Sequence, residues 1–507
     1  MSTRIAVLRN LAMLSIASYI EMAIALGVGV VVARSLGSVE FGHYAFAVWV
    51  CGTLTLLINN ALTMSSIRFV AEARGAGRPD EAAALVQQFQ RWHGISSATV
   101  LGGFVVFAVA HPPSDWGDSL MVLVPLLVVG AWGRAGYMLM ASIGKGNERF
   151  EVESGSLLLS ALANGVLVLL LALVGASMTG FFAVYAVCGL LQNLSARIML
   201  RRLQIRPNNQ DLEPALAQRV KRHLLQSGAL AVVGLLGDRT IEVLLLKGFS
   251  SSEAVGYFAI AGALTRGITY LLAGALTSVL LPAMSRAFGL GGPGAVGRML
   301  HESVRFYWFI GLAIAGLGCT AAPGAVRLLY GSQYEAAIPA VTVNLTLSGL
   351  MLVTAAFNAF LTSNDRQGDR IRIALLSMGA NLIAGLALVP AFGLAGALGA
   401  LAITKFTYLA LSWNFARRTE GVTMPVSPMA RTLGAALLAG ALAMTFDWLV
   451  PGRFAFIGVA VIFLSGYALA SAFGGAWTPA DADLFVNILA RFGPVGKASA
   501  RWITARR

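Results

Sequence analysis

Four basic side chains stand inside long apolar stretches of the sequence, at Arg134, Arg239, Arg266 and Lys405. A cation at the centre of a membrane helix costs on the order of 2.5–3.5 kcal/mol, so each should be paired or face a wet cavity. Guanidinium groups match phosphate oxygens with two parallel hydrogen bonds. These four residues are therefore candidate contacts for an anionic, phosphate-bearing ligand.

Each of these basic residues also has a structural interpretation. Arg239 can pair with Glu242 three residues later, and Asp238 adjoins it, whereas Arg266 has no acidic residue within four positions. Arg134 can bond carbonyl groups of a neighbouring helix, and Lys405 can extend its stem toward the membrane surface.

Glu21 is the most isolated acidic residue in the apolar stretches, with no cation three or four positions away. It is either a proton carrier or the charge partner of Arg239 or Arg266. Asn59 and Asn60 are candidate contacts for sugar hydroxyls, although hydrogen bonds between helices are the usual role of such side chains in membranes.

Other chemistry is not indicated. All three cysteines fall in apolar runs, so we expect no disulfide and no metal site. The longest outer connection, about 323-336, has no histidine or paired carboxylates, and no GxxxxGK[ST] sequence occurs. We therefore expect no catalytic residue, no cofactor and no ATP hydrolysis by this chain.

The composition is that of a membrane protein, since 57% of the 507 residues are hydrophobic and only 12% are charged. Apolar runs long enough to cross about 30 Å of hydrocarbon recur along the chain. They predict an all-α polytopic protein with about fourteen transmembrane helices, near 11-33, 41-66, 92-110, 119-141, 154-175, 178-200, 223-246, 256-281, 302-323, 337-361, 371-390, 394-416, 429-450 and 454-473.

Basic residues fix the expected orientation of these spans. With both termini in the cytoplasm, 29 of the 37 lysines and arginines fall on the cytoplasmic side. Such loops facing anionic lipid account for the net charge of +14, and no nucleic-acid partner is needed to explain it.

The chain also contains a long repeat. VVVARSLGSVEFGHYAFAV at 30-48 resembles LLLKGFSSSEAVGYFAIAG at 244-262, and an offset of 213 residues superimposes the first six spans on the next six. Both copies have an even number of spans and so run in the same direction. This predicts two parallel six-helix lobes at 1-200 and 223-416, a cytoplasmic linker at 201-222, two extra transmembrane helices within 417-474 and a cytoplasmic amphipathic, basic tail at 475-507.

Several motifs, set in this 6+6+2 plan, carry a family resemblance. The repeated turns are accompanied by three further motifs, NNALTMSSIRFVAE, GDRTIEVLLLKGFSSSEAVGYFAIAGALTRG and VLLPAMSR. Together they make the chain similar to the lipid-linked oligosaccharide flippases of the polysaccharide transporter family. That family shares a superfamily with lipid II flippases and multidrug extruders. The resemblance covers essentially residues 5-420.

The resemblance implies two lobes that rock between inward-open and outward-open states in a bacterial cytoplasmic membrane. The implied cargo is a polyprenyl-pyrophosphate-linked glycan for lipopolysaccharide or exopolysaccharide. The resemblance also places Arg239 and Arg266 on cavity-lining helices, which makes them the strongest candidates for headgroup contact. Membrane lipid and other polysaccharide-assembly proteins are candidate partners, and a lobe pair forms its cavity as a monomer. A Na⁺- or H⁺-coupled drug or metabolite extruder is the alternative, followed by a multi-span glycan polymerase or ligase. The surplus of intramembrane cations favours an anionic cargo.

Overall fold

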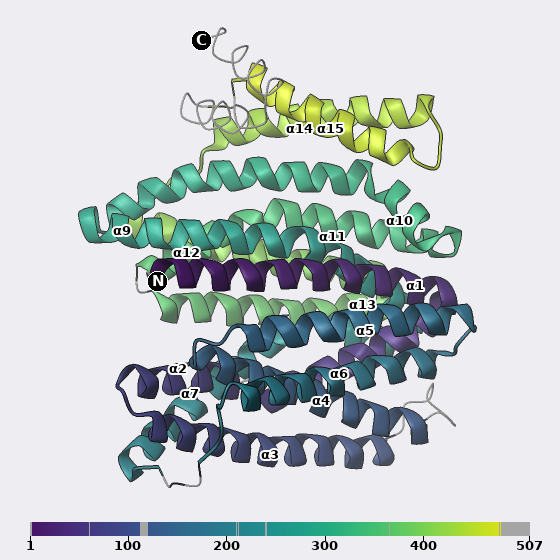
Figure 1. Cartoon of the computed structure of the whole chain (residues 1–507). Coiled ribbons are helices and arrows are strands. Elements are labelled where there is room, and N and C mark those ends of the chain that lie inside the picture. The colour runs from purple at the N-terminus through teal and green to yellow at the C-terminus, as the bar shows by residue number, and fades with distance from the viewer. Residues whose placement is uncertain are drawn as a thin grey trace. The chain divides into compact units, whose positions relative to one another are not determined.

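The computed structural model describes residues 3–59, 61–111, 120–208, 210, 212–238, 241–364, 366–475 and 477. Within these ranges the chain is helical and contains no strand (Figure 1). Its elements are α1 (Thr3–Asn59), α2 (Leu62–Gly75), α3 (Pro79–Ala110), α4 (Leu120–Gly146), α5 (Glu151–Leu173), α6 (Met178–Arg202), α7 (Pro214–Asp238), α8 (Ile241–Phe249), α9 (Ser252–Thr320), α10 (Ala322–Tyr330), η2 (Ser332–Ala337), α11 (Ile338–Leu350), η3 (Met351–Val353), α12 (Thr354–Ser363), α13 (Gln367–Glu420), α14 (Val426–Leu449) and α15 (Ala455–Phe473).

Three long helices each cover two of the predicted spans. Helix α1 breaks at Gly37, whose φ of 77° is open mainly to glycine, and α13 breaks in the same way at Gly393. Helix α9 breaks at Gly291 and Gly292. Ten helices of the described part are long and apolar enough to cross a membrane. The protein is therefore an all-α polytopic membrane protein, and the count of fourteen spans stays a prediction.

Packing divides the chain into two compact units. The first contains residues 1–259 and 385–397, and the second contains 260–384 and 398–507. Helices α7 and α8 and the start of α9 thus pack with the N-terminal helices, although the sequence repeat assigns them to the second predicted lobe. The repeat boundaries near 201-222 and 417-474 stay predictions, and the tail from 478 onward lies outside the described residues.

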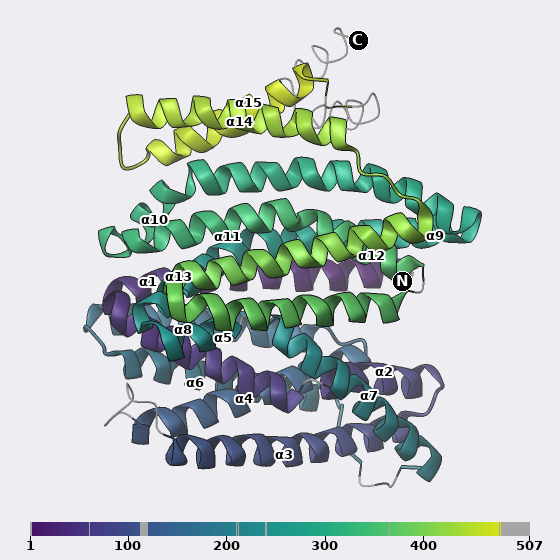
Figure 2. The same ribbon diagram turned by 180° about the vertical axis from the view of Figure 1, so that it is seen from behind.

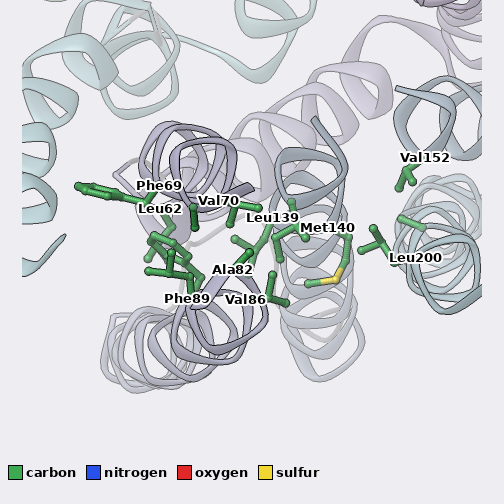
Figure 3. Packing of buried hydrophobic residues seen from close by; sticks show 14 of the residues in the cluster. Leu62, Phe69, Val70, Ala82, Val86, Phe89, Leu139, Met140, Val152 and Leu200 are labelled. Carbon is green, nitrogen blue, oxygen red and sulfur yellow. The ribbon is translucent and has the colours of Figure 1, made fainter. Parts of the chain in front are cut away.

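The core of the first unit joins α2, α3 and α4 (Figure 3). Phe69 and Val70 of α2 and Phe89 of α3 are fully buried there against Leu139 and Met140 of α4. On α3 the buried positions 82, 85, 86 and 89 recur every three or four residues, as required for one face of a helix. The core fixes α4, which carries one of the intramembrane arginines.

Helix α7 is attached to α2 by a polar contact. Arg219 donates two hydrogen bonds to Glu72, at 2.6 and 3.0 Å, and these bonds raise the pKa of Arg219. One turn further, Ser65 Oγ and His223 Nδ1 lie 3.0 Å apart, and the His223 ring stands edge-on to Phe69. Helix α7, which the sequence repeat assigns to the second predicted lobe, is thereby fastened to α2 at its basic end.

This contact predicts an efficient disulfide. In a variant without the three native cysteines, we expect Ser65→Cys with His223→Cys to crosslink almost completely under mild oxidation, because the native side-chain atoms are in hydrogen-bond contact. Gel mobility in inverted membranes measures the yield. Met64→Cys with His223→Cys is the matched control, since Met64 is exposed beside Ser65. Equal yields from the two pairs would contradict the contact.

Within the second unit, α14 and α15 form an antiparallel hairpin (Figure 2). Small residues on α14, among them Ala439 and Ala443, are fully buried in a cluster with Phe463 and Tyr467 of α15. The Tyr467 hydroxyl donates to the Phe309 carbonyl at 2.9 Å, and Trp308 Nε1 donates to the Met429 carbonyl at 3.1 Å. The hairpin is thus anchored to the second half of α9.

Candidate functional site

Glycines bring α4 and α6 unusually close in the first unit. A Cβ on Gly133 would lie 2.7 Å from the backbone of Gly189, and one on Gly130 would lie 3.3 Å from Cα of Ala186. Small residues allow this backbone approach between membrane helices. The same contact places Arg134 directly against α6, with its Cγ 3.1 Å from the Cβ position of Gly189.

Arg134 is held by neutral groups of α6, and one carboxylate lies within electrostatic range of it. Its guanidinium carbon lies 3.7 Å from the centroid of the Tyr185 ring, and Nη2 donates to the Tyr185 carbonyl at 3.4 Å. Glu21 of α1 is close enough for electrostatic attraction to Arg134. A ring face stabilises a cation most strongly where water is scarce. Arg134, Tyr185 and Glu21 are hereafter called the charge centre.

Aromatic rings line the outer side of this centre. Tyr44 of α1 stands edge-on to Phe182, with centroids 6.4 Å apart, and Phe182 stacks on Tyr185 at 5.7 Å. Tyr44 is buried and belongs to the first copy of the repeated turn. The turn and the charge centre are therefore one continuous packing group.

The two copies of the repeated turn cross each other in the first unit. The backbone of Ser252 lies so close to Gly42 that a Cβ there would overlap the Ser252 carbonyl, and a Cβ on Gly256 would lie 3.3 Å from Cα of Gly42. Ser38 Oγ donates to Glu253 at 3.5 Å. Lys247 Nζ donates to Ser252 Oγ at 2.8 Å and lies 5.6 Å from the Phe46 ring centroid. We call this set of contacts the turn crossing.

The strongest sequence candidates are only partly placed. Arg239 and Asn60 lie outside the described residues, as does the side chain of Asp238. Arg266 is on α9 in the second unit, exposed, with its guanidinium beside Gly262 one turn back. Glu242 on α8 is completely buried in the first unit. Their roles as substrate contacts or charge partners stay predictions.

Asn59 has the interhelical role in this structure. It is fully buried, its Nδ2 donates to the Ala135 carbonyl at 2.5 Å, and its Oδ1 lies 3.2 Å from His93 Nδ1. In this conformation neither polar atom is open to a sugar. The burial of Asn59, and not its residue type, decides whether its side chain is accessible to a ligand.

Lys405 contributes a second polar cluster, within the second unit. Its Nζ donates to Ser348 Oγ at 3.2 Å, and one turn further the Tyr408 hydroxyl bonds Asn358. The ammonium therefore points toward α11 and is not extended along the helix surface. Its role as a substrate contact stays a prediction.

Sequence reasoning missed Tyr185 and the Lys145–Glu153 ion pair at 2.8 Å. Both join different helices, so no spacing along one helix reveals them. The one usable signal was the three-residue spacing of Gly130, Gly133 and Gly136, which predicts a close helix contact at the level of Arg134.

A match to a protein-family model identifies the family of this chain. The model described as polysaccharide biosynthesis protein matches residues 7–288, which is more than half of the chain. The chain belongs to this family. The match includes the charge centre and the turn crossing of this family member. No curated protein sequence matches it.

Solved structures agree on the fold of this family member. The lipid II flippase MurJ in an inward closed conformation is 13% identical, with a TM-score of 0.68 over 91% of this chain and 98% of that one. An inward-facing multidrug resistance MATE family transporter of the MOP superfamily is 14% identical, with a TM-score of 0.63 over 81% and 98%. A MOP superfamily transporter from Pyrococcus furiosus, whose title notes a reverse polarity of the binding pocket, is 16% identical, with a TM-score of 0.55 over 81% and 95%.

Proposed function

We propose that this protein is a flippase that moves a polyprenyl-pyrophosphate-linked oligosaccharide across the bacterial cytoplasmic membrane by alternating access. Its family works in polysaccharide biosynthesis, and its fold is that of flippases and transporters. The observation that carries the cargo assignment is the charge inside the membrane helices. The apolar stretches contain four basic residues against three acidic ones, Glu21, Asp238 and Glu242, and this positive surplus suits a pyrophosphate.

In this proposal Arg266 and Arg239 bind the pyrophosphate, and the prenyl tail remains in lipid. Binding shifts the equilibrium between states only through its different affinity for each. The turn crossing is the outer gate, because it holds both copies of the repeated turn together. Glu21 couples proton movement to the cycle through Arg134. Both termini and the basic ends of the helices lie in the cytoplasm, as their positive charge indicates.

One observation favours a cation-coupled extruder as the second candidate. The MATE family fold is shared, and Glu21 is a carboxylate within the first membrane helix. An organic cation would require a carboxylate-rich site, however, and Glu21 is already attracted to Arg134. A polymerase or ligase role is the third candidate, and no observation favours it over transport.

Native mass spectrometry of the detergent-purified protein tests the cargo. We expect the wild type to carry a polyprenyl-pyrophosphate glycan, and Arg239→Ala/Arg266→Ala to carry at least about tenfold less, since charged hydrogen bonds contribute about 1.5–3 kcal/mol each. Arg366→Ala/Arg372→Ala is the matched control, because both arginines are exposed at the start of α13. A wild type that carries no such lipid but shifts with cationic drugs or Na⁺ would make the extruder the leading assignment.

A further inference from the structure

An apolar groove lies between α3 and α4 in the first unit. It has a volume of about 330 Å³ and is lined by Gly94, Ala98, Leu101 and Gly102 of α3 and by Val128 and Trp132 of α4. Trp132 is 43% exposed, and no atom lies within 4 Å of the Cβ positions of Gly94 and Gly102. The groove is therefore open along its length, and no helix of the described part of the chain fills it.

The groove faces the hydrocarbon. In both views α3 lies at the edge of its unit, beside α4 (Figures 1 and 2). The outward side of α3 carries exposed apolar residues, at Ile95, Val106, Phe107 and Val109. Exposed apolar residues on a membrane-spanning helix face lipid chains.

A single cation stands at one end of the groove. Arg91 lies three residues before Gly94, and the spacing 91, 94, 98, 101, 105 places it on the same helix face as the lining residues. Arg91 is exposed, and among the residues that the structure describes it has no acidic partner. The groove thus has a cationic end and an apolar body.

Depth along the helix matches one membrane leaflet. The twenty residues from Arg91 to Ala110, the end of α3, span about 30 Å at 1.5 Å per residue, which is the thickness of the hydrocarbon core. Arg91 therefore lies at the boundary of this hydrocarbon core, on the side of the protein where the basic ends of the helices lie. From Gly94 to Val105 the groove runs about 17 Å inward, which is close to half the core.

We propose that this groove binds one anionic glycerophospholipid of the basic-side leaflet. The phosphate pairs with Arg91, and one acyl chain lies along the small residues of α3 against Trp132. Buried Ser97 also lines the groove and lies 3.5 Å from His93, which bonds Asn59, so the groove floor is packed on the network that joins α1, α3 and α4. The bound lipid stabilises the first unit and is not the transported cargo.

Native mass spectrometry with two added lipids of identical chains, dioleoyl phosphatidylglycerol and dioleoyl phosphatidylcholine, tests the site. We expect the wild type to bind the first phosphatidylglycerol about fivefold more tightly than the first phosphatidylcholine. One basic side chain near an anionic lipid contributes about 1 kcal/mol, which corresponds to this factor. Arg91→Gln should remove this preference, whereas Arg74→Gln, an exposed arginine at the end of α2, should keep it. An unchanged preference in Arg91→Gln would overturn the headgroup assignment.

The site for the acyl chain of the lipid is tested by substitutions at two adjacent glycines. Gly102→Leu fills the groove and should weaken both lipids about tenfold, whereas Gly103→Leu should not, since Gly103 is equally open but does not line the groove. Equal effects of the Gly102 and Gly103 variants would overturn the groove as the binding site of the acyl chain. A polyprenyl monophosphate is the third probe. Its displacement of phosphatidylglycerol from wild type but not from Gly102→Leu would assign the groove to the cargo tail and overturn the proposal.

Discussion

Replacing Gly42 with valine should separate the two repeated turns. The Ser252 carbonyl occupies the space that a side chain would take, and both partners at this point are backbone, so neither can rotate away. Overpacking of this kind costs about 1–3 kcal/mol, which is about a 5- to 150-fold change in a conformational equilibrium. The state with crossed turns should be depopulated by that factor, and transport should fall with it.

A short bis-maleimide crosslinker reports the crossing directly. In a variant without native cysteines, Ser38→Cys and Glu253→Cys stand where the native side chains are 3.5 Å apart. We expect Gly42→Val to slow this crosslink at least about fivefold. Gly27→Val is the control, because Gly27 lies on the same helix with open space around it. If crosslinking the turns left transport unchanged, the crossing would not be a gate.

Replacing Arg134 with alanine should produce the second large effect, on stability. The substitution removes the guanidinium from the Tyr185 ring and leaves Glu21 without the cation that it is attracted to. A desolvated cation–ring contact contributes about 2 kcal/mol, and the longer-range attraction of Glu21 adds less than the 3–5 kcal/mol of a fully buried ion pair. We expect the apparent Tm in detergent to fall by about 2–5 °C.

Two companion variants separate the contributions within the charge centre. Tyr185→Phe keeps both the ring and the carbonyl, so its Tm should match the wild type within about 1 °C. Glu21→Gln/Arg134→Gln should lose less stability than the sum of the single variants, with a coupling of about 0.5–3 kcal/mol. An unchanged Tm in Arg134→Ala together with loss of bound glycan would instead make Arg134 a cargo ligand.

The sequence predicted the helical membrane fold because apolar length and loop charge act through local physics. Residues 11-66 were expected as two spans and correspond mainly to the two halves of α1, which reverses at Gly37 in the repeated turn, and α2 follows from Leu62. The attachment of α7 to α2 was not predictable, since the Arg219–Glu72 contact joins residues 147 positions apart and no local pattern records it.

The candidate site was predictable in its residue types but not in its pairings. Arg134 was recognisable as costly, yet its contact with Tyr185 depends on how α4 and α6 approach each other at Gly133 and Gly189. Asn59 is completely buried with both polar atoms engaged, and its role as a sugar contact stays a prediction. Burial depends on the packing of several helices, which one sequence does not specify.

The reversals at Gly37 and Gly393 have a consequence for antibodies and proteases. Each joins two successive membrane helices with a single residue outside the helical conformation, so neither turn offers an extended segment to a protease cleft or a paratope. Gly37 also leads directly into the residues that cross the second turn. An epitope tag or reporter inserted there would force the crossing apart, so labels belong elsewhere on this face of the protein.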